Sequence, residues 1–66
     1  MNIRLEEKIA ILKGLSRSYA RLYKIMKKAK NFQAAEFYRE EQYKCYKKAI
    51  ELEMQLYEIY DYLKVA

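Results

Sequence analysis

The feature of this sequence best suited to binding a ligand is a row of regularly spaced basic side chains. Between Lys8 and Ala35 the chain has no acidic residue. At about 100° per residue, five positive side chains of this stretch fall within an arc of about 80° over about 22 Å of helix. Such a row can follow the phosphates of DNA or RNA without reading base sequence. The predicted nucleic-acid contacts are Lys13, Arg17, Arg21, Lys24 and Lys28.

The same basic row also suits roles that do not involve nucleic acid. A charged outer face keeps any small helical bundle in solution. A basic amphipathic helix is equally suited to an anionic membrane surface or an acidic protein partner. The net charge of +5 is compatible with each of these alternatives.

The sequence contains few of the residue types that catalysis and metal binding require. The chain has no histidine and one cysteine, so no Ser–His or Cys–His pair is possible and a zinc site is not expected. Glu36 and Glu40 lie one helical turn apart, but adjacent carboxylates on a helix surface are ordinarily solvated. We expect no enzyme, no metal and no cofactor. Cys45 falls on an apolar face and is expected to be a small buried hydrophobe, with an intermolecular disulfide as the alternative.

Two helical patterns that are out of phase must position these side chains. Up to residue 26 the apolar residues recur at steps of three and four. Continued past Asn31 in the same register, that face would place Lys44, Lys47 and Glu51 in the core. A new register after the break predicts a second helix instead. One continuous helix is the alternative, because no proline interrupts the chain.

The change of register predicts an all-α antiparallel hairpin. Its helices should cover about 3–30 and about 33–64, with a turn at about 31–33. Asn31 suits the turn either as a left-handed residue after the first helix or as the N-cap of the second. The predicted core of the first helix is Leu5, Ile9, Leu12, Tyr19, Tyr23 and Met26. That of the second is Ala35, Tyr38, Gln42, Cys45, Ala49, Leu52, Leu56, Ile59 and Leu63.

Two further features concern the first helix. Asn2 is a candidate N-cap for it. Gly14 lowers helix propensity by up to about 1 kcal/mol and, with Ser16, could divide the helix in two. The apolar period passes through both residues unchanged, which favours one helix.

The apolar faces are wider than a two-helix hairpin can cover. On the second helix the core and a tyrosine-rich stripe together span about 200°, against the roughly 100° that one core-facing side needs. The apolar face of the first helix is widened in the same way by Ile11, Leu15, Leu22 and Ile25. A second copy is the simplest cover, so we predict a homodimer with the plan of a four-helix bundle. The predicted protein interface is Tyr43, Tyr46, Ile50, Tyr57 and Tyr60.

Length and composition set the remaining limits. Sixty-six residues allow one domain, 1–66, and a core of this size usually needs a staple, a metal or a partner to be stable. No apolar run is long enough to span a bilayer, and a lone cysteine suits a reducing compartment, so we expect a cytoplasmic protein. We predict a non-enzymatic regulatory protein that binds nucleic acid. The alternative is a protein–protein adaptor that uses the tyrosine-rich face of the second helix.

Overall fold

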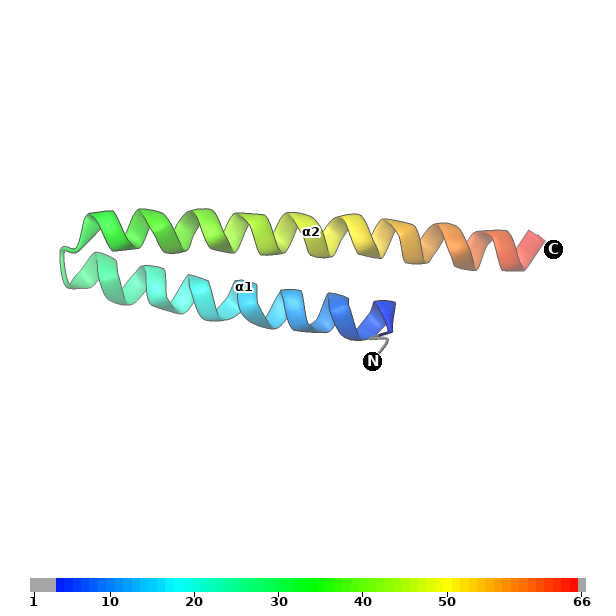
Figure 1. The fold of residues 1–66 in the computed structure, drawn as a ribbon, viewed down its shortest axis with the longest axis horizontal. Helices are drawn as coiled ribbons and strands as arrows, with labels where there is room; N and C mark the ends of the chain where they lie inside the picture. Colours follow the sequence, from blue (N-terminus) through cyan, green and yellow to red (C-terminus); the bar gives the residue numbers. More distant parts are fainter. Residues whose placement is uncertain (1–3, 66) are drawn as a thin grey trace.

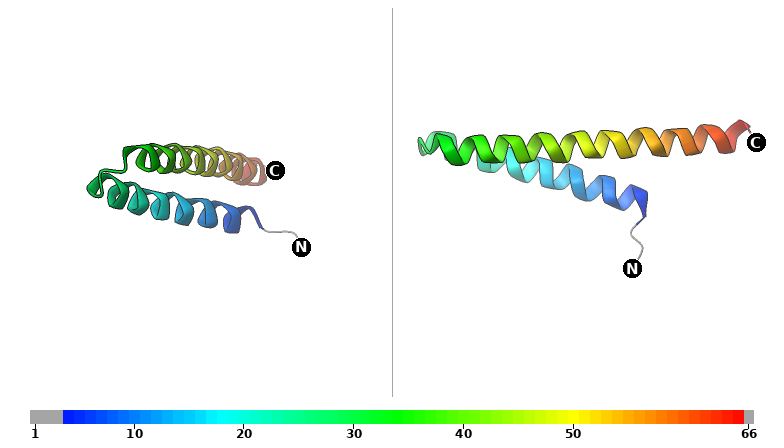
Figure 2. Two further views of the ribbon diagram at one scale, coloured as in Figure 1. Left: turned by 60° about the vertical axis from the view of Figure 1, so that its left-hand side comes forward. Right: turned by 45° about the horizontal axis from the view of Figure 1, so that its top comes forward.

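The fold is a hairpin of two long helices. The computed structural model describes residues 4–65 of the chain. Helix α1 covers Leu5–Lys28 and helix α2 covers Phe32–Val65, and α2 folds back antiparallel to α1 (Figure 1). The predicted all-α hairpin is therefore confirmed, and the alternative of one continuous helix is wrong. Figure 2 shows that α1 is inclined to α2 rather than strictly parallel to it.

The first described helical residue of α1 is Leu5. Arg4 precedes the first helical residue in an extended conformation, and its side chain makes no capping hydrogen bond. The predicted cap Asn2 and the predicted start at residue 3 lie outside the described residues. Further along, α1 continues without a break through Gly14 and Ser16, so the alternative of two shorter helices is wrong.

Two capping structures that share one residue make the connection between the helices. Lys30 has a φ of 61°, which places it in the left-handed region, and the Asn31 N–H donates to the Met26 carbonyl over 2.9 Å. This is the Schellman pattern that ends α1. The Asn31 side-chain oxygen then accepts a hydrogen bond from the Ala34 N–H at 3.2 Å. Asn31 is thus the predicted N-cap, whereas the left-handed residue is Lys30, so the helix ends before the predicted turn at about 31–33.

The core is a single thin seam between the helices. Among the described residues no large side chain is completely buried. Tyr19 of α1 and Tyr38 of α2 stack across the seam with ring centroids 6.1 Å apart. Both belong to the predicted core, as do the buried apolar residues, which are Ile9, Ala35, Ala49 and Leu52. Ser16 is buried as well. Cys45, which was predicted to be buried, is only half-buried.

The unequal helix lengths leave one end of α2 uncovered. With 34 residues against 24, α2 extends past the described start of α1 (Figure 1). Ile59 and Leu63 lie toward this end and are 49% and 63% exposed. Their predicted place in the core is therefore wrong for the hairpin. The seam on α2 ends near Leu56, which is half-buried.

Candidate nucleic-acid interface

The predicted basic row follows one side of α1. Its members are all exposed, and they keep the arc of about 80° expected from helix geometry because α1 is unbroken. Lys13 forms an ion pair with Glu53 of α2. Within residues 4–64 the other four members have no ion-pair partner, and these are Arg17, Arg21, Lys24 and Lys28. The free positive charge of the row therefore lies in the half of α1 nearest the connection.

The tyrosine stripe of α2 lies on the same side of the hairpin as the basic row. Arg17 of α1 and Tyr46 of α2 line one open groove, together with Gln42 between them. A neighbouring groove on α2 is lined by Gln42, Tyr46, Tyr43 and Arg39. Two surfaces that were predicted separately from the two helices are thus one surface. We call it the basic–tyrosine face, and its members are Arg17, Arg21, Lys24, Lys28, Arg39, Tyr43 and Tyr46.

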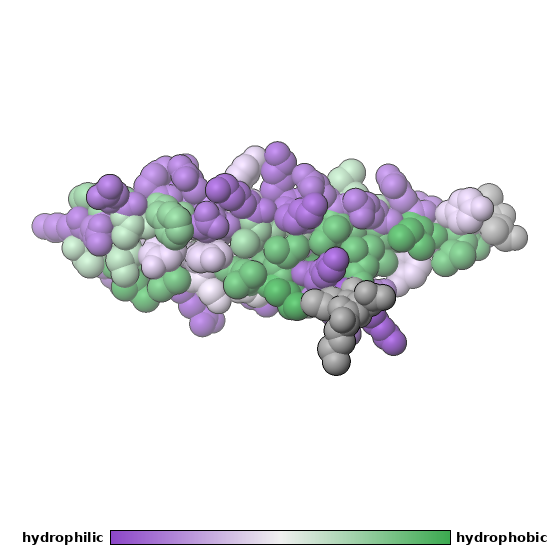
Figure 3. Space-filling view, viewed as in Figure 1, coloured by the Kyte–Doolittle hydropathy of each residue, from purple (hydrophilic) through white to green (hydrophobic). Residues whose placement is uncertain are grey.

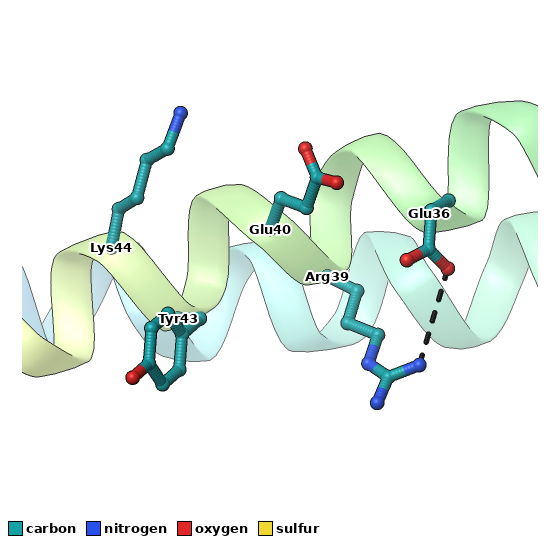
Figure 4. Close-up of a pocket in the computed structure, with 5 residues that line it drawn as sticks. All are labelled: Glu36, Arg39, Glu40, Tyr43 and Lys44. Carbon is teal, nitrogen blue, oxygen red and sulfur yellow. Dashed lines mark ion pairs between the residues drawn. The ribbon is translucent and has the colours of Figure 1, made fainter.

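Arg39 extends the basic row onto the second helix. In Figure 4 its side chain and that of Tyr43 extend to one side of α2, while Glu40 and Lys44 extend to the other. Arg39 reaches Glu36 at 4.0 Å, with both side chains about two-thirds exposed. An exposed pair at this distance contributes little, since water and salt screen it. The Arg39 guanidinium is therefore still able to bind a phosphate.

Arg39 was not among the predicted site residues, although helix arithmetic contains the signal. At about 100° per residue it falls at nearly the same angle as Tyr43 and Tyr46. The candidate acid pair of Glu36 and Glu40 is divided in the structure, because Glu36 turns toward Arg39 and Glu40 turns away (Figure 4).

The predicted tyrosine interface is divided between two environments. Tyr43 and Tyr46 lie beside the free basic side chains. Tyr60 lies at the other end of the hairpin, where its hydroxyl donates to the Glu6 carboxylate at 3.2 Å. Ile50 and Tyr57 are exposed along the same stripe, between Tyr46 and Tyr60. Glu6 and Glu53 make this second end acidic or neutral, so only the end nearest the connection is positive.

A second stripe on α1, on the flank away from the basic row, is apolar. By helix geometry this stripe lies about 120° from the basic row. Its residues Ile11, Leu15 and Ile25 are exposed, and Leu22 is half-buried. Ile11 of this stripe lines an open groove with Leu12 of α1 and Leu52 of α2, and the same groove is also lined by Lys8, Lys48 and Gln55. Figure 3 shows hydrophobic surface gathered along the junction of the two helices. We call this surface the aliphatic face, and its α1 members are Ile11, Leu15, Leu22 and Ile25.

Comparison of the chain with protein-family models, curated proteins and solved structures finds no match. In the part of the chain that the structure describes, neither helix contains a stretch that is both long enough and apolar enough to cross a membrane. The same residues contain no cluster of three or more side chains suited to a metal ion. Function must therefore be argued from the two faces of the hairpin.

Proposed function

We propose that the chain is a non-enzymatic regulatory protein that binds the phosphates of nucleic acid through its basic–tyrosine face. The observation that carries this proposal is the gathering of basic side chains from both helices on one side. Arg17, Arg21 and Lys24 come from α1, and Arg39 joins them from α2. A flexible arginine is suited to phosphate because its guanidinium can donate two hydrogen bonds at once.

The size of the face sets the expected strength of binding. From Arg17 to Lys28 the basic row rises about 16 Å along α1, enough for about four phosphate contacts. Four contacts to a single strand predict a slope of log affinity on log salt of about −3. The affinity should therefore fall by about 50-fold between roughly 50 and 200 mM salt.

Charge reversal tests the proposal with a matched control. The variant Arg17→Glu/Arg21→Glu should weaken the binding of a fluorescent oligonucleotide, measured by anisotropy at low salt, by at least about tenfold. The control Lys44→Glu/Lys47→Glu changes the net charge equally on the outer side of α2 and should have a much smaller effect. Equal losses would mean that only net charge matters. Wild-type protein that fails to bind at low salt would overturn the proposal.

We also propose that two copies associate through their aliphatic faces. The hairpin alone has a thin core, and chains of this size rarely gain enough stability from such a core. In a symmetric dimer the same patch of each copy meets its counterpart. Pairing through the tyrosine stripe would bring Arg17 and Arg39 of one copy near those of the other. The α1 stripe of the aliphatic face carries no charge, and pairing there makes a four-helix bundle with both basic–tyrosine faces open.

A protein–protein adaptor is the second candidate function. It is favoured by the exposed ring of Tyr57, which lies on the tyrosine stripe but outside the positive region. An acidic protein would be a suitable partner for the side of the hairpin that carries the basic–tyrosine face. For an adaptor, Tyr46→Ala and Tyr57→Ala should be the most damaging changes. For a nucleic-acid-binding protein, Tyr57→Ala should have little effect and Arg17→Glu the larger one.

A further inference from the structure

We propose that the basic–tyrosine face selects single-stranded over duplex nucleic acid, with unpaired bases stacked on Tyr43 and Tyr46. This inference rests on the proposed function and names the class of ligand. It depends on the position of the two tyrosine rings, whereas phosphate binding depends only on the basic side chains.

The rings of Tyr43 and Tyr46 are free to accept a base. They are 64% and 54% exposed, and within residues 4–64 neither hydroxyl makes a hydrogen bond. Three other tyrosines of the hairpin have partners. Tyr19 and Tyr38 stack on each other, and Tyr60 donates to Glu6.

Each free ring lies beside a guanidinium. Tyr46 shares a groove with Arg17, and Tyr43 shares the neighbouring groove with Arg39. Three residues of helix separate the two tyrosines, a rise of about 4.5 Å and a rotation of about 60°. A nucleotide needs a ring for its base and a positive charge for its phosphate, and this face repeats that combination. Such alternation of aromatic and basic side chains is typical of surfaces that bind single strands.

A duplex would leave these rings unused. Its bases are stacked on each other and present only their edges in the grooves. A duplex could therefore contact the arginines and lysines of the face but not the faces of the two tyrosine rings. An unpaired base gains about 5- to 150-fold in affinity from one aromatic stack. Single strands should consequently bind more tightly than a duplex at equal salt.

The experiment compares a labelled oligothymidine strand with a duplex of the same length by fluorescence anisotropy at fixed low salt. Wild-type protein should prefer the single strand by at least about tenfold. The variant Tyr43→Leu/Tyr46→Leu should lose at least about tenfold in affinity for the strand and keep its affinity for the duplex. Tyr43→Phe/Tyr46→Phe should retain its affinity for the single strand, because stacking uses the ring and not the hydroxyl.

The control variant Tyr57→Leu/Tyr62→Leu removes two exposed tyrosines that lie outside the positive region. It should bind both ligands like wild type. Circular dichroism checks that each variant remains helical, and the wild-type preference tests the inference without any substitution. Equal affinity of wild-type protein for strand and duplex would overturn the inference and leave phosphate binding intact. Failure to bind either ligand would overturn the proposed function as well.

Discussion

Lys13 of α1 and Glu53 of α2 form an ion pair that joins the two helices across the basic–tyrosine side of the hairpin. The Glu53 carboxylate is about three-quarters buried, and the Lys13 side chain is about half exposed. The pair neutralises the first member of the predicted basic row. Although sequence places Lys13 and Arg17 in one row, the fold gives them different environments.

A comparison of Lys13→Ala with Arg17→Ala should therefore show unequal losses of nucleic-acid affinity. Arg17 has no ion-pair partner within residues 4–64, so its removal deletes a phosphate contact. The salt slope should become shallower by about 1 for Arg17→Ala and remain nearly unchanged for Lys13→Ala. The measurement is anisotropy titration of a single-stranded oligonucleotide over a series of salt concentrations. Equal slopes for the two variants would show that Glu53 does not remove Lys13 from the binding surface.

A second prediction concerns the proposed dimer through the aliphatic face. Ile11→Glu/Leu15→Glu places two carboxylates on the aliphatic face. If the proposed dimer forms through this face, the variant should remain a single copy where wild type pairs, because charge cannot be buried in an apolar seam without a partner. Sedimentation equilibrium measures the mass. The control Ile50→Glu changes an exposed apolar residue on the tyrosine stripe and should leave the dimer intact. Dissociation by Ile50→Glu alone would instead favour the interface predicted from the sequence.

The helices and most of the seam are predictable because periodicity fixes the angle of each residue within its own helix. Ile9 and Leu52 are buried where their registers place them. Periodicity contains no information on which flank of one helix meets which flank of the other. The common face of Arg17 and Tyr46 depends on that choice, and so does the Lys13–Glu53 pair. These features appear only when the two helices are packed together.

The connection and the far end of α2 were less predictable for local reasons. Asn31 suits two capping roles equally well in sequence, and a lysine in the left-handed region has no sequence signature. The exposure of Leu63 depends on where the partner helix begins, which the pattern of α2 alone does not contain. Arg39 lies outside the predicted basic row because that row follows the geometry of the first helix alone.

Gly14→Ala should stabilise the fold. Gly14 lies inside α1, and an added Cβ would meet nothing within 4 Å. Alanine raises helix propensity by about 1 kcal/mol over glycine in a helix interior. The free energy of unfolding, measured by urea titration at one protein concentration, should rise by about that amount. The reverse change Ala10→Gly, at an exposed position of the same helix, should lower it by a similar amount. No gain from Gly14→Ala would imply that α1 bends or packs at this residue.

Substitutions at the two adjacent residues of the connection should change the free energy of unfolding in opposite directions. Lys30 is left-handed, so Lys30→Gly removes a steric cost of about 1 kcal/mol or more and should stabilise the hairpin despite the greater freedom of glycine in the unfolded chain. Asn31→Ala removes the acceptor of the Ala34 N–H and should destabilise it by about 1 kcal/mol.

Two controls separate the capping roles in the same urea titrations. Asn31→Asp keeps a side-chain acceptor at the start of α2 and should restore most of the stability lost in Asn31→Ala. If Asn31 were itself the left-handed residue, as the sequence also allowed, Asn31→Gly would be stabilising and Lys30→Gly would not. Because Lys30 has the positive φ and Asn31 has the capping hydrogen bond, the gain belongs at residue 30 and the loss at residue 31.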